Sequence, residues 1–267
     1  MLKTFKEIGR HIIHSDGAMY NFLGNWYTTF YDASVRPESG VNAIILNGGT
    51  LANDRKISTI VFPDRVEHYD VAEIFRPLSS MIGFKTHDGK CGYLNADGQE
   101  IIAPLYTSIG RFVGKIVEVS MMVPEDNQPG TAMVERCGLL DRDGLIVVPC
   151  IYNKIYSNTK MNFVVEYAGV YGAFDKHGNL VIPMVYKRIY PYKKHYTTCI
   201  GGNGKYGILN KTGEIFPCIA DNIEIYDTVT KIVIDGEDNY FHQNTPEDMA
   251  VSNQIKEFAA KKVRLNV

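Results

Sequence analysis

Four segments of the chain repeat one pattern of two glycines, and this periodicity restricts the fold more than any other sequence feature. In each segment the second glycine follows six residues after the first, and a proline follows four to six residues later. The glycine pairs are Gly92 and Gly98, Gly138 and Gly144, Gly172 and Gly178, and Gly207 and Gly213. The prolines are Pro104, Pro149, Pro183 and Pro217. The first glycines are 34 or 35 residues apart, except that 46 residues separate Gly92 from Gly138. Such a period predicts one supersecondary unit per repeat, arranged in tandem.

The local composition of a repeat predicts β-strands. Residues 163–167 and 170–174 are rich in β-branched and aromatic side chains, and Ala168-Gly169 separates them as a turn. Residues 176–179 contain Gly178 and predict a tight turn, and residues 180–182 predict a third strand that ends at Pro183. Each repeat is therefore expected to be a three-stranded meander followed by a tyrosine-bearing connection. The polar segment 124–130 accounts for the longer first spacing as a loop insertion.

The residue before the first glycine suggests a family. This residue is Cys91, Cys137, Tyr171 or Tyr206. A residue-Gly pair, an Asp/Asn-x-x-Gly turn and a Pro-x-x-Tyr segment in this order resemble the WG-repeat (KWG) family, over residues 81–244. That family has tryptophan before the glycine, where this chain has Cys or Tyr. The resemblance implies a β-repeat architecture and an interaction-type role, and it carries no catalytic residues.

The array extends beyond four repeats. Residues 231–234 and 240–242 have the composition of two strands of a fifth unit, and a third strand is missing. Residues 56–62 end at a proline and precede an aromatic connection, as the third strand of a repeat does. Our hypothesis is that they complete the last unit. The fold class is then mainly β, either a propeller-like ring of about five blades or an open β-solenoid with capped ends.

The two ends of the chain differ from the repeats. The spacing of Leu2, Phe5, Ile8 and Ile12 predicts a short amphipathic helix near residues 3–14. Thr245 and Pro246 are typical of a helix start, and Met249, Ile255, Phe258 and Ala259 form an apolar face. The expected domains are a non-repeat segment at 1–50 that packs on the repeats, a β-repeat domain at 51–244 and a helix at 245–267.

Composition excludes several functional classes. The chain of 267 residues has a net charge of −2 and mixes acidic with basic residues, so we expect no nucleic-acid or membrane partner. Charge interrupts residues 1–10, which argues against a signal peptide. The five cysteines include no C-x-x-C pair, so reduced thiols in a cytoplasm are expected.

Motifs for chemistry are absent from the sequence. His11 and His14 lack a third ligand at metal-site spacing, so we expect no metal. Turn aspartates such as Asp175 stand singly, without the run of acids that a calcium loop needs. No nucleotide-binding or nucleophile-elbow motif occurs, and no cofactor is expected. A cysteine–histidine pair that assembles only in space stays open, and an enzyme is the less favoured interpretation.

Two functions from different classes remain. The first is a non-catalytic scaffold that binds another protein, and the second is a ligand- or glycan-binding propeller, which could include an enzyme. Aromatic and cationic side chains favour recognition surfaces. The tyrosine-rich connections and the aromatic segment 20–31 supply them. The candidate binding residues are Tyr156, Tyr186, Tyr190, Tyr192, Lys193, His195, Trp26 and Tyr27. For each of them the alternative is ordinary packing in the core.

Overall fold

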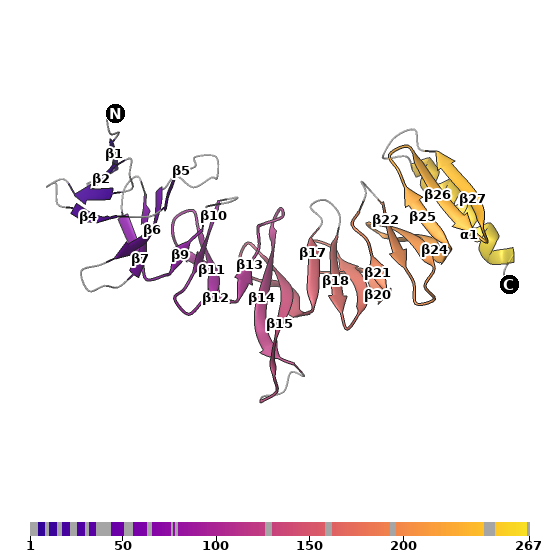
Figure 1. The fold of residues 1–267 in the computed structure, drawn as a ribbon, viewed down its shortest axis with the longest axis horizontal. Coiled ribbons are helices and arrows are strands. Elements are labelled where there is room, and N and C mark those ends of the chain that lie inside the picture. Colours follow the sequence, from indigo (N-terminus) through magenta and orange to yellow (C-terminus); the bar gives the residue numbers. More distant parts are fainter. Residues whose placement is uncertain are drawn as a thin grey trace. The chain divides into compact units, whose positions relative to one another are not determined.

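The computed structural model describes residues 5–8, 11–14, 18–21, 26–29, 32–35, 44–50, 56–62, 66–75, 77, 80–125, 130–157, 162–192, 196–242 and 249–265. Two compact units divide the chain: residues 1–135 with 139–146, and residues 136–138 with 147–267. Within the described residues, the regular structure is antiparallel β-sheet apart from one C-terminal helix (Figure 1). The prediction of a mainly β fold built from tandem meanders is confirmed. Four-stranded antiparallel meanders are the units from which β-propellers are built.

The N-terminal residues form strands rather than a helix. The first sheet contains β1 (Phe5–Ile8), β2 (His11–His14), β3 (Ala18–Asn21) and β4 (Trp26–Thr29). Phe5 pairs with His14, and Ile8 pairs with His11. The predicted helix over residues 3–14 is therefore wrong. Gly9 weakens a helix at its centre, and helices shorter than about 12 residues are marginal without tertiary support.

A second sheet rules out the proposed completion of the last unit. It contains β5 (Asp32–Val35), β6 (Ile44–Thr50), β7 (Lys56–Val61) and β8 (Val66–Tyr69). Strand β7 pairs with β6 along one edge and with β8 along the other. Because both edges are occupied, the hypothesis that residues 56–62 complete the last unit is wrong. Strand β6 ends at Thr50, which pairs with Lys56 of β7. The domain boundary that the sequence predicts at residue 50 therefore falls inside a hairpin.

The four glycine repeats supply sixteen strands, four to each sheet. Their bounds are β9 (Glu73–Ile74), β10 (Met81–Lys85), β11 (Cys91–Asn95), β12 (Glu100–Tyr106), β13 (Ser108–Ile109), β14 (Ile116–Pro124), β15 (Met133–Asp141), β16 (Ile146–Tyr152), β17 (Lys154–Ser157), β18 (Phe163–Tyr167), β19 (Val170–Phe174), β20 (Leu180–Tyr186), β21 (Arg188–Ile189), β22 (Tyr196–Ile200), β23 (Tyr206–Asn210) and β24 (Gly213–Ala220). The connection that follows each proline is itself a strand, so a repeat has four strands rather than the expected three.

The proline of a repeat lies inside a strand instead of ending it. Strand β20 continues past Pro183 to Tyr186. Ala173 pairs with Ile182 and Tyr171 pairs with Tyr186, and the register shifts between these two pairs. The shift places Pro183 in a β-bulge, where its missing N–H breaks no ladder hydrogen bond. The prediction that the third strand stops at the proline is therefore wrong.

Two glycines of the repeat have separate structural causes. A Cβ atom on Gly172 would lie 2.7 Å from the carbonyl oxygen of Ile182, so only glycine lets the bulged strand pass. Gly178 has φ +81°, the left-handed conformation that its turn requires. In the same turn a carboxylate oxygen of Asp175 accepts hydrogen bonds from the backbone N–H groups of His177 and Asn179. The turn aspartates thus support the backbone.

The insertion at 124–130 lengthens one hairpin. Strands β14 and β15 have nine residues each, compared with five in β18 and β19. The backbone N–H of Glu125 donates to the carbonyl of Ala132 beyond the ends of these strands. The extra residues lie in this hairpin, as the sequence predicts, but many of them extend its two strands instead of forming a loop (Figure 1). Residues 126–129 of the predicted loop lie outside the described residues.

The fifth unit is partial, as predicted. It contains β25 (Asn222–Ile225), β26 (Val229–Ile234) and β27 (Glu237–His242), and helix α1 (Met249–Leu265) follows. Ile255 and Ala259 of α1 are buried in the core below this sheet, and Phe258 stacks on Phe216. The helix therefore packs on its own unit, as its apolar face predicts. Within the described residues, no helix combines the length and apolar character needed to cross a membrane.

Candidate functional site

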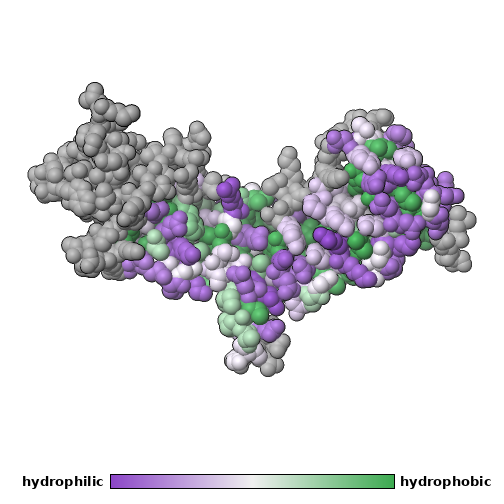
Figure 2. All heavy atoms as spheres, in the orientation of Figure 1, coloured by the Kyte–Doolittle hydropathy of each residue, from purple (hydrophilic) through white to green (hydrophobic). Residues whose placement is uncertain are grey.

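Two cavities in the second unit bring together most of the candidate tyrosines. The first has a volume of about 380 Å³ and contains Tyr156, Tyr171, Tyr190 and Tyr192 in its wall. The second has a volume of about 480 Å³ and shares Tyr190, Pro191 and Tyr192 with the first. Pockets lined by aromatic groups with a few polar ones are the usual form of a binding site. On the face drawn in Figure 2, hydrophobic and hydrophilic residues of this unit are interspersed.

The two cavities occupy equivalent positions in successive repeats. A step of 34 residues along the chain relates six residues of the first wall to six of the second, whereas Tyr171 and Arg188 have no counterpart in the second wall. The matching pairs are Tyr156 and Tyr190, Val164 and Thr198, Ile189 and Ile223, Tyr190 and Glu224, Pro191 and Ile225, and Tyr192 and Tyr226. The cavity therefore recurs in successive repeats, while its side chains differ between the two copies.

Stacked tyrosines form one side of the first cavity. The rings of Tyr156 and Tyr171 lie 6.4 Å apart between centroids with 23° between their planes. Tyr156 extends from β17 and is 47% exposed. Pairing of Tyr156 with buried Val164 fixes its strand, so the ring has a defined position at the cavity.

A cation lies at the same cavity. The guanidinium of Arg188 is 5.0 Å from the centre of the Tyr190 ring, within the range of a cation–π interaction. Arg188 is exposed, and no ion pair joins it to a carboxylate among the described residues. Its five N–H donors form a fork that matches a carboxylate. The first cavity is therefore aromatic with one positive charge.

The wall between the two cavities is fixed by backbone and hydroxyl contacts. The Tyr190 carbonyl accepts a 2.5 Å hydrogen bond from the Thr197 hydroxyl, and the Tyr190 N–H donates to Thr198. The Tyr192 hydroxyl is 3.3 Å from the Asn210 carbonyl. Burial raises the pKa of Tyr192 to about 12, so the hydroxyl remains a donor at neutral pH. The wall is thus held in place without a ligand.

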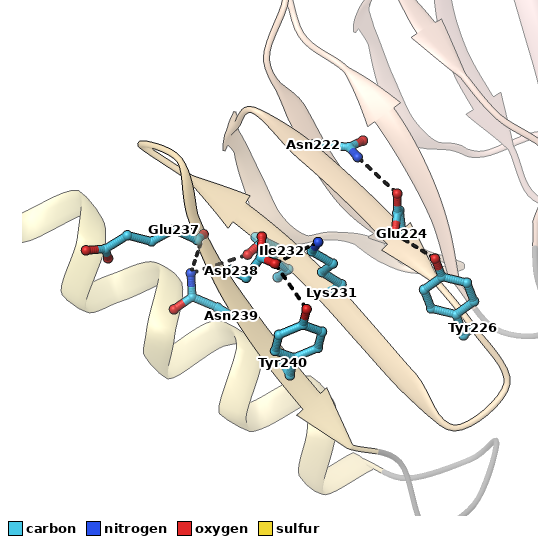
Figure 3. A network of polar contacts seen from close by, with 9 residues as sticks. All are labelled: Asn222, Glu224, Tyr226, Lys231, Ile232, Glu237, Asp238, Asn239 and Tyr240. Atoms are coloured by element: carbon cyan, nitrogen blue, oxygen red, sulfur yellow. Dashed lines mark hydrogen bonds and ion pairs between the residues drawn. The ribbon is translucent and has the colours of Figure 1, made fainter.

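The second cavity carries the opposite charge. A carboxylate oxygen of Glu224 accepts a 2.6 Å hydrogen bond from the Tyr226 hydroxyl, and the other oxygen is 3.3 Å from the Asn222 amide nitrogen. Figure 3 shows Glu224 between these two side chains along β25. Lys231 pairs with Glu224 across the strands, but its ammonium bonds Asp238 at 2.8 Å. Glu224 is therefore an oriented carboxylate in the wall of this cavity.

The predicted binding residues separate into three groups. Tyr156, Tyr190 and Tyr192 line the first cavity. Tyr186 does not, because it is only 5% exposed and its hydroxyl lies 3.3 Å from a carboxylate oxygen of Glu214. The remaining candidates contribute no described side chain: Lys193 and His195 lie outside the described residues, and of Trp26 and Tyr27 only the backbone in β4 is described.

Sequence reasoning missed the charged members of the site. Arg188 and Glu224 each stand one residue from a buried isoleucine that closes a repeat, at Ile189 and Ile223. Shifting the sequence by one repeat would have aligned Tyr156 with Tyr190 and with Glu224. This alignment is the signal that could have identified Glu224 as a charged residue at a variable position of the repeat, and it does not identify Arg188.

Two of the cysteines, Cys150 and Cys199, are poorly suited to nucleophilic chemistry, whereas the hydrogen bond with Cys199 lowers the pKa of Cys218. All five are free thiols. Burial raises the pKa of Cys150 to about 11. A hydrogen bond to Cys218, at 3.6 Å between the sulfurs, together with burial holds the pKa of Cys199 above its usual range. Since the thiolate is the nucleophile, these two protonated thiols are unreactive. The described residues contain no group of three or more possible metal ligands from His, Cys, Asp and Glu.

The fold is that of a tandem β-meander repeat protein, in which two successive repeats carry equivalent cavities. The family model described as "WG containing repeat" matches residues 92–121 and 171–194. The resemblance to WG repeats is therefore confirmed at these two segments. The second segment contains Tyr171, Arg188, Tyr190 and Tyr192 of the first cavity.

Comparison with whole proteins gives only distant likenesses. No curated protein matches the sequence. Hsv2p of Kluyveromyces lactis is 11% identical with a TM-score of 0.34, over 91% of this chain and 93% of that one. BamB from Moraxella catarrhalis is 9% identical with a TM-score of 0.32, over 90% and 87%. The computationally designed Ika8 protein is 9% identical with a TM-score of 0.31, over 90% and 83%. The fold assignment rests on the strand pairing described above.

Proposed function

We propose that this protein is a non-catalytic interaction module whose second unit binds a segment of a partner protein at the two cavities. The observation that carries the proposal is the pair of tyrosine-lined cavities at equivalent places in successive repeats. Tyrosine supplies a large contact area at low entropic cost and is enriched at binding hot spots. Tyr156 and Tyr226 are 47% and 53% exposed, so both rings are available to a ligand.

The cavities favour binding over glycoside hydrolysis. Hydrolysis of a glycosidic bond normally uses two carboxyl groups on either side of the bond. None of the described residues that line the first cavity is acidic, and Glu224 is the single acid among those of the second. Stacked tyrosines can also bind sugar rings without catalysis, so a glycan-binding module is the second candidate. A direct comparison of peptide and sugar ligands separates the two functions.

The test is a selection from a displayed library of random peptides with the purified full-length protein, beside an array of oligosaccharides. We expect enrichment of peptides whose binding is lost in the Tyr190→Ala variant, because Tyr190 borders both cavities. The matched control is Tyr167→Ala, since Tyr167 is 49% exposed on β18 but lines neither cavity. Circular dichroism confirms that each variant is folded.

Enrichment that is equally sensitive to both substitutions would contradict the proposed site. Binding of oligosaccharides that depends on Tyr190, without any peptide enrichment, would replace the proposed function by the second candidate.

A further inference from the structure

We infer that the two cavities hold two side chains of one extended peptide: an acidic residue beside Arg188 and, three positions away, a basic residue beside Glu224. This inference rests on the proposed function and specifies its ligand. It follows from three observations: the equivalence of the cavities, the wall that they share, and their opposite charges.

The geometry of the repeat sets the spacing of the peptide side chains. The cavities share the segment 190–192, so a ligand that enters both must cross this wall. Sheets that pack face to face are roughly 10 Å apart, and we take this value as the step between the two cavities. A polyproline II chain rises about 3.1 Å per residue with three residues per turn, or about 9 Å per turn. Side chains at positions i and i+3 therefore point to the same side and match successive cavities.

The first cavity selects a negative charge. Arg188 is exposed with its guanidinium against the Tyr190 ring, so the stacked ring orients the fork without neutralising it. The other walls are the rings of Tyr156 and Tyr171, which pack against the aliphatic part of a side chain. A glutamate has both parts: a short aliphatic stem for the rings and a carboxylate for the guanidinium.

The second cavity selects a positive charge. Asn222 and Tyr226 hold the Glu224 carboxylate from two sides but contribute no charge (Figure 3). The nearby ammonium of Lys231 is bound by Asp238, whose carboxylate also lies 3.1 Å from the Tyr240 hydroxyl. Glu224 therefore keeps its negative charge available to the cavity, next to the exposed ring of Tyr226. An arginine or lysine side chain of the ligand complements this pair.

The two charges favour a peptide over a neutral sugar. Stacked rings alone would suit both ligands. A neutral oligosaccharide, however, would leave Arg188 and Glu224 without charged partners, whereas an extended peptide can present both signs at a fixed spacing. Proline at the intervening positions would preform the extended chain and lower the entropic cost of binding.

The test uses fluorescein-labelled proline-rich peptides and the full-length protein, with fluorescence anisotropy as the readout. One pair of peptides carries Glu and Arg three positions apart, in the two possible orders. A second pair carries the same residues at adjacent positions, and a third peptide carries Gln at both positions. We expect at least one order of the three-position pair to bind about three- to fivefold more tightly than the other designs.

Two charge reversals supply the decisive controls. Arg188→Glu should lose the preference for the acidic residue and instead bind more tightly to a peptide with Lys at that position. Glu224→Lys should show the reciprocal change, with a gain for a peptide that has Glu in place of Arg. Asp227→Lys is a matched control for net charge, because Asp227 is exposed in the turn after β25 and lines neither cavity.

The outcomes separate this inference from the proposed function. If library peptides bind through Tyr190 but the spacing and charge of the designed peptides have no effect, the inference is overturned and the proposed function stands. If neither selected nor designed peptides bind, both are overturned. Equal binding of all designed peptides by the charge-reversed variants also overturns the inference.

Discussion

The ring of Tyr156 stacks on the ring of Tyr171, with 6.4 Å between centroids and 23° between planes. Tyr171 stands directly before Gly172, where the WG-repeat family has tryptophan. At the same position of other repeats, Cys91 is buried and its sulfur is 3.8 Å from the Thr107 carbonyl, and Cys137 makes the equivalent contact with Asn153. The signature position is therefore a packing residue in two repeats and part of a cavity wall in a third.

Removal of Tyr156 should separate binding from folding. Tyr156→Ala should lower the free energy of unfolding by only about 1 kcal/mol, because the lost contacts are one stacked pair and a half-exposed ring. The same substitution should weaken the binding of the selected peptides. The loss should be at least as large as the loss that Tyr190→Ala causes in the binding of the uncharged peptide with Gln at both positions. Urea denaturation and anisotropy titrations measure the two effects. A large loss of stability without a loss of binding would show that Tyr156 is a core residue.

Gly207→Ala should destabilise the second unit by about 1–3 kcal/mol, the usual cost of overpacking. A Cβ atom there would lie 2.8 Å from both the Cys218 sulfur and the Phe216 carbonyl oxygen. Adding Cys218→Ala should restore only part of the free energy of unfolding, because the backbone oxygen remains. Gly202→Ala is the control, since nothing lies within 4 Å of its added Cβ. Equal unfolding midpoints for Gly207→Ala and Gly202→Ala would contradict this account.

Ile255→Ala should cost about 2–5 kcal/mol of unfolding free energy, because Ile255 is 4% exposed where α1 packs on the last sheet. The neighbouring exposed residue Lys256 provides the control, and Lys256→Ala should change the free energy of unfolding by less than about 0.5 kcal/mol. Thermal and urea unfolding measure both variants. Similar small effects for the two would mean that the helix contributes little to the stability of its unit.

The protein should lose stability in alkaline solution because of Tyr93. Burial raises the pKa of Tyr93 from 10.0 to about 12, and its hydroxyl donates a 2.5 Å hydrogen bond to the Gly110 carbonyl. Because Tyr93 ionises at lower pH in the unfolded chain than in the folded protein, raising the pH favours unfolding. The contribution of Tyr93 to the free energy of unfolding is therefore fully present below pH 10 and is lost as the pH rises through about 12.

The matching variant is Tyr93→Phe. It should be about 1 kcal/mol less stable at pH 7, where the hydrogen bond is lost, and should fall less steeply than the wild-type protein above pH 10. Urea midpoints at several pH values measure this. Parallel curves for the two proteins would show that Tyr93 does not ionise in this range.

Much of the local structure follows from the sequence, because turns and strands depend on neighbouring residues. Ala168 and Gly169 have φ 50° and 79°, as a tight hairpin turn needs, and Asp175 supports the following turn as its position predicts. The strands at residues 5–8 and 11–14, where the sequence predicts a helix, could not be predicted in this way. Their apolar spacing fits a helix, but pairing of Phe5 with His14 decides the conformation. Short apolar segments have no preference strong enough to resist such pairing.

The sequence by itself determined the phase of the repeats, the turn positions, the partial fifth unit and the C-terminal helix. Only the tertiary structure decided which tyrosines are available to a ligand. Tyr186 and Tyr156 both belong to connections after a repeat proline, yet they are 5% and 47% exposed. The reason is strand register and position in the sheet: Tyr186 ends β20 and is buried like Tyr152 at the same place one repeat earlier, whereas Tyr156 lies on β17, at the opposite edge of the sheet. The same register brings Arg188 and Glu224 into equivalent cavities, which no pattern of residue types displays.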